Sequence, residues 1–281
     1  MNALLAAWAT VGLTPVSVAG LIFAALTAGF FDAIAGGGGL ITVPALLATK
    51  LPIHMAFGTN KGQAVWGSGA ATWSFWRAGL VERDRAIPSF IAGFVGSLLG
   101  AVLLLSVSPA VLRPVVMVLL VIVAVFMTFR PPLDPKPKNL SPNTALAIAV
   151  GLAVVIGCYD GFFGPGTGTF LIIGQVLLLG TSMKSGSANA KVVNFASNLA
   201  AFGLLAWQGQ VAWAVALPMA LAQFIGATLG VRAAIRGGDK LIRWVVLAVC
   251  LGLCAKLAFD AWGDLIRAEF GLLLAWLAPG R

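Results

Sequence analysis

The sequence contains little charge: Asp, Glu, Lys and Arg make up 10% of its 281 residues, whereas soluble domains contain about 25%. A soluble protein of this length could not cover its surface with so few charged side chains. The longest polar stretch, residues 130–143, holds five prolines, a composition typical of a short, stiff loop. A soluble fold is therefore excluded, and a membrane is expected to surround most of the chain.

Histidine and cysteine are also scarce. The single histidine, His54, argues against a histidine-based metal site. Cys158, Cys250 and Cys254 lie in apolar segments without metal-ligand spacing, so we interpret them as small buried side chains. The phosphate-binding pattern G-x-x-x-x-G-K-[ST] is absent, so the chain itself is not expected to hydrolyse ATP. We predict no metal and no cofactor.

Apolar residues make up 60% of the sequence, and they form repeated runs. About 20 such residues are needed to cross a hydrocarbon core of about 30 Å. The runs are continuous rather than alternating, which predicts helices instead of barrel strands. No cation precedes the first run, whose first charged residue is Asp32, so this run is expected to be a membrane segment and not a cleaved signal peptide. The predicted fold class is an all-α polytopic membrane protein.

The formal net charge is +9, which raises the question of nucleic-acid binding. That function needs an exposed basic face with aromatic side chains. Here the cations lie in the loops between apolar runs, so they are better interpreted as topology signals. No nucleic-acid partner is predicted.

An internal repeat relates the two halves of the chain. At an offset of 128 residues Asp32 aligns with Asp160, and after two extra residues near Asn189 an offset of 130 aligns Lys61 with Lys191. The other aligned positions are glycines, a proline and an arginine: Gly29/Gly157, Gly36/Gly164, Gly38/Gly166, Gly58/Gly186, Gly79/Gly209, Pro88/Pro218, Gly96/Gly226, Gly100/Gly230 and Arg113/Arg243. Chance could align apolar residues, but it would not readily align these residue types in one order.

Positive charges in the loops indicate that the halves have opposite orientations in the membrane. Loop 77–85 carries three arginines and its repeat partner 207–211 carries none, whereas turn 108–113 carries one and its partner 232–243 carries four cations. With 77–85, 130–140 and 232–243 in the cytoplasm, ten of the eleven Lys and Arg residues of these five loops are inside. The sequence therefore predicts an inverted-topology repeat, a common build of secondary transporters.

The predicted organisation follows from this repeat, with about eight to ten membrane segments that include short broken helices. It comprises a first repeat (1–130), a Pro-rich cytoplasmic linker (131–142), a second repeat (143–260) and a short apolar C-terminal helix (261–281). Each half is predicted to contain a long segment, a short apolar piece, a polar segment and two spans: 15–35, 39–49, 56–76, 86–107 and 111–129, then 143–163, 167–180, 186–206, 211–231 and 241–259. The last apolar run, 265–278, is shorter than a crossing needs.

Each half contains a glycine-rich break after its long segment. Residues 36–39 are four consecutive glycines, and residues 164–168 read Gly-Pro-Gly-Thr-Gly. Such backbone at membrane depth is tolerated only where protein buries it or a cavity lines it. Glycine lets successive N–H groups converge on an anion, and the following short helix aims its positive dipole end there. The alternative is close helix packing, which favours glycine at every fourth position.

Candidate substrate contacts lie in and after these breaks. Hydroxyl and amide groups supply donors, and a lysine near each break offsets the cost of a desolvated anion. The predicted substrate-binding residues are Gly36, Gly37, Gly38, Gly39, Thr42, Asn60, Lys61, Gly164, Gly166, Thr167, Gly168, Thr169, Asn189, Lys191 and Asn194. For both lysines, snorkelling from a helix end to the interface is an equal alternative.

Asp32 and Asp160 lie just before the breaks. An ionised carboxylate within the bilayer is costly, so it is expected to be paired or functional. One interpretation is loop anchoring, in which the carboxylate accepts hydrogen bonds from freed backbone N–H groups. The other is proton coupling, in which it is protonated in one half of a transport cycle. The sequence leaves both open.

These breaks carry a family resemblance. The segment GFFDAIAGGGG followed by LITVP (29–44), and the segment DGFFGPGTGTF (160–170), resemble the two motifs of the TauE/SafE sulfite exporter family. The likeness spans nearly the full chain and implies a bacterial cytoplasmic-membrane permease for sulfite, sulfonates or related anions, of the 4-toluene sulfonate uptake type. It also implies that 36–39 and 164–168 line the path. Asn60 and Lys61 depart from the less charged stretch expected there, which puts the role of Lys61 in question.

The predicted function is a secondary transporter of a small sulfur-containing oxyanion that is coupled to protons and works by alternating access at the two breaks. An anion channel is the alternative, because channels also use backbone-lined filters. A membrane-embedded enzyme is disfavoured, because it would need a nucleophile–base pair or metal ligands. The predicted partners are the anion, protons and the bilayer, and a homo-oligomer is left open.

Overall fold

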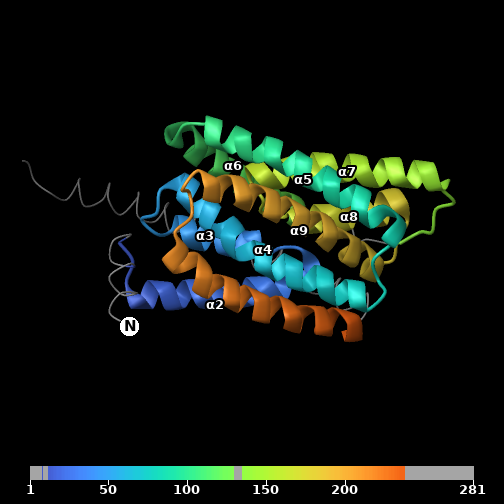
Figure 1. Cartoon of the computed structure of the whole chain (residues 1–281), viewed down its shortest axis with the longest axis horizontal. Helices are drawn as coiled ribbons and strands as arrows, with labels where there is room; N and C mark the ends of the chain where they lie inside the picture. The colour runs from blue at the N-terminus through green and yellow to red at the C-terminus, as the bar shows by residue number, and fades with distance from the viewer. Residues whose placement is uncertain (1–7, 9–11, 130–134, 238–281) are drawn as a thin grey trace, which may run out of the picture.

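The structure, a computed structural model, describes residue 8 and residues 12–129 and 135–237, and its regular elements in these residues are all helices (Figure 1). This confirms the predicted all-α class. The predicted segments 241–259 and 265–278 lie outside the described residues, as do Cys250 and Cys254.

The described helices follow the predicted segments closely. They are α2 (Pro15–Ala35), α3 (Gly39–Leu47), α4 (Ile53–Arg77), α5 (Arg83–Ser106), α6 (Pro109–Phe129), α7 (Pro142–Phe162), α8 (Thr167–Leu179), α9 (Met183–Trp207) and the helix Trp213–Gly237. The largest difference is at the end of the last helix, which runs six residues beyond the predicted 211–231. The two segments that follow the short helices each begin three residues earlier than predicted, at Ile53 and Met183.

In the described part of the chain, four helices are long and apolar enough to cross a membrane: α2, α5, α7 and Trp213–Gly237. Helices α4 and α9 have 25 residues each, but they are less apolar because polar side chains interrupt them. Figure 1 shows α4 and α9 in the middle of the bundle, with α5 and α7 on one side and α2 and the helix Trp213–Gly237 on the other. The polar segments of the chain are therefore shielded by its apolar ones.

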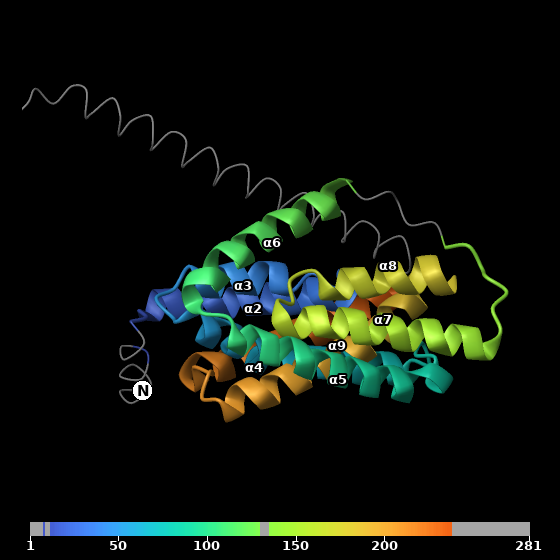
Figure 2. The ribbon, with the colours of Figure 1, turned by 90° about the horizontal axis from the view of Figure 1, so that it is seen from above.

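The broken helices form two hairpins that enter the bundle from opposite ends. In Figures 1 and 2, α2 runs inward from the left-hand end and α3 turns back toward it, whereas α7 runs inward from the right-hand end and α8 turns back toward that end. Both breaks therefore lie inside the bundle. This placement matches the expectation that non-helical backbone is buried in protein.

The basic loops lie together at one end of the bundle. In Figure 1 the end of α4, the starts of α5 and α7, and the end of the helix Trp213–Gly237 are at the right-hand end. These helix ends border the described parts of loops 77–85, 130–140 and 232–243. A shared end is what the charge pattern requires, because positive loops collect on one side of a membrane.

Glycines bring the two halves into close contact. A Cβ atom on Gly100 of α5 would lie 2.0 Å from the carbonyl oxygen of Cys158 in α7. At the repeat-related position, a Cβ atom on Gly230 would lie 2.3 Å from the carbonyl oxygen of Phe30 in α2. Small residues allow such backbone approach between membrane helices. The long helix of each half thus packs on a span of the other half.

The outer face of the bundle is apolar. Large exposed side chains cover the outward faces of α2, α5, α6 and the helix Trp213–Gly237, among them Phe23, Ile87, Met117 and Leu221. A soluble protein rarely exposes contiguous apolar patches of this extent. The polar and charged side chains Lys61, Asp160 and Lys191 are buried instead, as expected for a protein that has a bilayer as its solvent.

Candidate functional site

The two breaks touch each other in the middle of the bundle. Gly36 and Gly164, which are repeat partners, have φ angles of +79° and +94°, a left-handed conformation that glycine adopts without steric cost. The amide of Thr169 donates to the carbonyl of Gly36 (3.3 Å), and the Thr169 hydroxyl donates to the carbonyl of Ala35 (2.7 Å). The start of α8 is therefore hydrogen-bonded to the end of α2.

One buried ion pair joins Lys61 of α4 to Asp160 of α7. Their Nζ and Oδ1 atoms are 2.8 Å apart, and the side chains are only 2% and 3% exposed. Asp160 also accepts hydrogen bonds from the hydroxyl of Thr167 (2.9 Å) and from the hydroxyl of Ser197. The carboxylate thus has three donors, which offset the cost of its burial.

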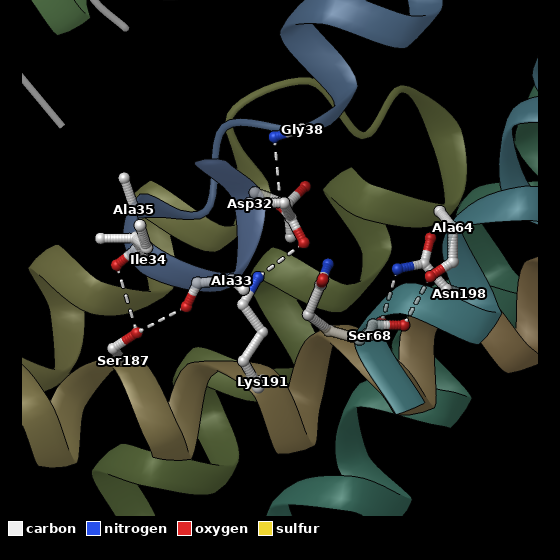
Figure 3. Close-up of polar contacts among 12 residues, drawn as sticks. Asp32, Ala33, Ile34, Ala35, Gly38, Ala64, Ser68, Ser187, Lys191 and Asn198 are labelled. Carbon is white, nitrogen blue, oxygen red and sulfur yellow. Dashed lines mark hydrogen bonds and ion pairs between the residues drawn. The ribbon is translucent and has the colours of Figure 1, made fainter. Parts of the chain in front are cut away.

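A second ion pair joins Lys191 of α9 to Asp32 of α2, with 2.7 Å between Nζ and Oδ2. Lys191 is fully buried and the Asp32 side chain is 13% exposed. The other carboxylate oxygen of Asp32 accepts the backbone amide of Gly38 at 3.1 Å. Figure 3 shows this chain of contacts, with Lys191 reaching from α9 to Asp32 and Asp32 facing Gly38.

The two ion pairs cross between the halves of the chain. Each aspartate precedes the break of its own half but pairs with the lysine of the other half. Two cations and two anions gather in this way, so the buried charges compensate each other. Separating either pair would leave an unpaired buried charge, which is costly. Both pairs therefore stabilise the contact between the hairpins and the central helices α4 and α9.

The carboxylates also occupy the starts of the short helices. Asp32 accepts the amide of Gly38, which precedes the first residue of α3, and Asp160 accepts the hydroxyl of Thr167, the first residue of α8. Helix N-termini attract anions through free N–H groups and the helix dipole. The contact between Asp32 and Gly38 is the one that loop anchoring requires.

A small cavity of about 20 Å³ lies between the breaks. This volume is enough for about one water molecule. Predicted residues of the first half that line it are Gly36, Gly39, Thr42, Asn60 and Lys61. Those of the second half are Gly164, Thr167, Gly168 and Asn194, and both Asp32 and Asp160 also line it. The cavity is therefore polar and is bordered by one lysine and two aspartates.

The other predicted residues lie outside this lining. Thr169 binds the carbonyl of Ala35, and Lys191 contacts Asp32 from α9. Gly37 and Gly38 are in the first break, and Gly166 is in the second, where its φ angle is +85°.

Asn189 is not brought to the cavity. Its side-chain oxygen accepts the backbone amide of Glu82 at 2.9 Å, at the start of α5. The reason is helical geometry, because residues two apart are turned about 200° from each other. Asn189 is two residues from Lys191, whereas Asn60 directly precedes Lys61, so the two asparagines are not equivalent. The residue that aligns with Asn60 at the offset of 130 is Ala190.

Three amide side chains that we did not predict also line the cavity: Gln63, Asn198 and Gln223. Gln63 donates to the side-chain oxygen of Asn60 at 3.1 Å, and Thr42 donates to the same oxygen at 2.6 Å. Gln63 and Asn198 each lie one helical turn after a predicted residue, a spacing that could have revealed them. Gln223 lies in another helix, where no neighbouring motif marks it.

Within the described ranges, no three His, Cys, Asp or Glu side chains gather in a geometry that could hold a metal ion. The Nε2 atom of His54 is 3.1 Å from the carbonyl oxygens of Leu104 and Val107. His54 therefore connects the start of α4 to the end of α5.

Comparison with known proteins gives consistent matches. The family described as "Sulfite exporter TauE/SafE" matches residues 21–257. A protein of Sinorhizobium sp named "Probable membrane transporter protein ORF9" is 40% identical over 240 residues, which are 85% of this chain and 92% of that protein. A "Probable membrane transporter protein" of Haemophilus influenzae is 39% identical over 83% of this chain and 91% of its own length. "Probable membrane transporter protein YfcA" of Escherichia coli K12 is 36% identical over 92% and 96%, respectively. No solved structure matches the chain.

Proposed function

The chain belongs to the sulfite exporter TauE/SafE family, and from this premise we propose that it is a secondary transporter of a small sulfur-containing anion. The four candidate spans among its described residues, together with its relatives, make it a multi-pass protein of the bacterial inner membrane. The observation that carries the proposal is the meeting of two broken helices around a polar cavity that Lys61 borders. Discontinuous helices that meet inside a bundle are typical binding sites of secondary transporters.

An anion suits this site for electrostatic reasons. Both short helices begin at the cavity, so their positive dipole ends face it, and Lys61 supplies a positive charge that becomes available to an anion when Asp160 no longer neutralises it. The surrounding side chains Asn60, Gln63, Asn194 and Asn198 can donate hydrogen bonds to several oxygens of one solute. We propose sulfite, a sulfonate or a similar oxyanion as the substrate.

Alternating access is supported by the arrangement of the halves. The hairpins enter from opposite ends, and equivalent glycines make equivalent contacts across the bundle. A cavity of about 20 Å³ has room for about one water molecule and is too small for an oxyanion such as sulfite. We therefore propose that the groups around the cavity move apart to admit one, as in a carrier rather than a permanently open channel. We propose the inverted repeat, with loops 77–85, 130–140 and 232–243 in the cytoplasm, as the basis of this motion.

Proton coupling is the second part of the proposal. Among the residues that the structure describes, Asp32 and Asp160 are the acidic residues that line the cavity, and each holds one lysine. A proton on either carboxylate would weaken its ion pair and could accompany the anion across the membrane.

Flux into proteoliposomes tests this function directly. Saturable uptake of sulfite or a small sulfonate that responds to an imposed pH gradient is the expected result, with protein-free liposomes as the control. An ohmic current without saturation would assign a channel, and conversion of the solute without accumulation would assign an enzyme. Either of these results would overturn the proposal.

A further inference from the structure

We propose that the two ion pairs have different roles: Lys61 is the cation that binds the transported anion, Asp160 holds Lys61 when no anion is bound, and the pair Lys191–Asp32 is a strut. This inference rests on the proposed transport function and assigns its parts to residues. The repeat alone would make both lysines equivalent, so the assignment depends on how the structure distinguishes them.

The first difference is access to the cavity. Lys61 lines the cavity directly, and its Nζ atom is 3.2 Å from the point that a Cβ atom on Gly164 would occupy. Lys191 is 0% exposed and does not border the cavity. Asp32, which is paired with Lys191, lines the cavity instead. An anion in the cavity can therefore approach the ammonium group of Lys61 directly, whereas it could reach Lys191 only by displacing Asp32.

The second difference is what each carboxylate keeps when its lysine leaves. Asp160 retains the hydroxyl groups of Thr167 and Ser197 as donors. Asp32 retains only the backbone amide of Gly38 among the hydrogen bonds that the structure describes. Since a buried carboxylate without donors is costly, Asp160 can release its lysine more easily than Asp32 can.

The cavity also contains polar atoms that the described protein groups do not satisfy. The side-chain oxygens of Gln63 and Gln223 are buried and have no hydrogen-bond partner among the described residues, and both residues line the cavity. Both side chains are at least nine-tenths buried. Buried polar groups normally have partners, and an amide oxygen can only accept, so these two oxygens fit a solute or water that donates hydrogen bonds, whereas the amide NH₂ groups of the same side chains are the donors available to an anion.

The proton balance of the proposed step is simple. A proton from the aqueous side binds a carboxylate oxygen of Asp160, the ammonium group of Lys61 is released, and the anion binds that ammonium group. The site gains one proton and one monovalent anion, so its net charge does not change. The groups that face Asp160 are Lys61 from α4, Thr167 from α8 and Ser197 from α9. Asp32, which is paired with Lys191, is the other charged residue of the described chain that lines the cavity. The Tyr159 hydroxyl donates to the carbonyl of Pro165.

The test compares matched double variants that remove both charges of one pair. Lys61→Gln/Asp160→Asn and Lys191→Gln/Asp32→Asn each leave the net charge unchanged and avoid an unpaired buried charge. Uptake of two anions, sulfite and methanesulfonate, is measured in proteoliposomes. Methanesulfonate is included because its charge does not vary with pH. We expect the Lys61/Asp160 variant to raise KM by about 10- to 100-fold, as for loss of a hydrogen bond to a charged group. The Lys191/Asp32 variant should change KM by less than about fivefold.

Single variants then identify the carboxylate that carries the proton. The readout is the ratio of uptake with and without an inward proton gradient, which a purely structural role would not change. Asp160→Asn should reduce this ratio to that of an uncoupled carrier, while counter-anion exchange continues. Asp32→Asn should keep the ratio of the wild type even where its rate is lower. Monodisperse elution in detergent establishes that each variant is folded.

The outcomes separate this inference from the proposed function. If the wild type takes up the anion but Asp160→Asn keeps its full pH response, or if the Lys191/Asp32 variant has the larger KM, the inference is overturned and the transport function stands. If the wild type shows no saturable uptake of either anion, the proposed function fails, and the inference fails with it.

Discussion

The Nζ atom of Lys61 lies 2.8 Å from Oδ1 of Asp160, and this contact joins a central helix of the first half to the broken helix of the second. Neither side chain is more than 3% exposed. The pair therefore has little water to screen it, and each charge depends on the other. Removing one partner of this buried pair should therefore lower the free energy of unfolding by more than removing one partner of a surface pair.

Lys61→Met should lower the free energy of unfolding by about 3–5 kcal/mol, because it leaves the Asp160 carboxylate buried without its counter-charge. The double variant Lys61→Met/Asp160→Leu should be more stable than the single variant, since no unpaired charge remains. Arg85→Met is the control: the Arg85–Glu82 pair is partly exposed, and its loss should cost less than about 1 kcal/mol. Reversible unfolding in mixed micelles measures all three. Equal losses for Lys61→Met and Arg85→Met would contradict the prediction.

Gly100→Ala should destabilise the contact between α5 and α7. The added Cβ atom would lie 2.0 Å from the carbonyl oxygen of Cys158 and 2.7 Å from the amide of Phe162, and backbone atoms cannot move aside locally. Overpacking of this kind costs about 1–3 kcal/mol. Gly151→Ala in α7 is a matched control, because nothing lies within 4 Å of its added Cβ atom. That variant should gain up to about 1 kcal/mol of helix propensity. Thermal unfolding in detergent compares the two, and equal midpoints would refute close packing at Gly100.

The helices and the breaks could be predicted from the sequence, because each depends on local properties. Apolar runs set the spans, and consecutive glycines with Pro165 set the breaks. The cations Arg232 and Arg236 predict a loop after residue 231, but the last described helix continues through both of them to Gly237. A helix buried in a bilayer gains from every further internal hydrogen bond.

The pairing within the site could not be predicted in the same way. The crossing of Asp32 with Lys191 and of Asp160 with Lys61 depends on how two hairpins meet in space, which no local pattern encodes. Asn189 lies away from the cavity, because the two-residue shift in the repeat lies beside it and changes which helical face it occupies. Gln223 was missed because it approaches the cavity from a helix that carries no polar motif.

Gly36→Ala should disrupt the contact between the breaks. Its φ angle of +79° disfavours any L side chain, and the added Cβ atom would lie 2.1 Å from the carbonyl carbon of Gly168. The control is Gly209→Ala, which has a similar φ angle of +69° but nothing within 4 Å, so it reports backbone strain alone, of about 1 kcal/mol or more. Gly36→Ala should abolish anion uptake, whereas Gly209→Ala should retain it. Uptake in proteoliposomes at matched protein content is the measurement, and equal activity of the two variants would show that contact between the breaks is not needed.

Single cysteines at Gly79 and Gly209 should be labelled from opposite sides of the membrane. Helices α4 and α9 end at opposite ends of the bundle (Figure 1), and these repeat-partner glycines follow those helix ends by two residues each. Their surroundings are matched, with φ angles of +70° and +69° and nothing within 4 Å of an added Cβ atom, so reactivity differs only through access. The positive charges beside Gly79 predict that it lies in the cytoplasm.

The experiment uses a variant whose Cys158, Cys250 and Cys254 are replaced by alanine, treated in whole cells with a membrane-impermeant maleimide. Gly209→Cys should react in intact cells, and Gly79→Cys should react only after permeabilisation. Labelling of both positions from the same side would contradict the inverted repeat, because an even number of crossings would then separate two equivalent turns. Reversed labelling would keep the repeat but invert the chain, and it would contradict the cytoplasmic placement of the basic loops.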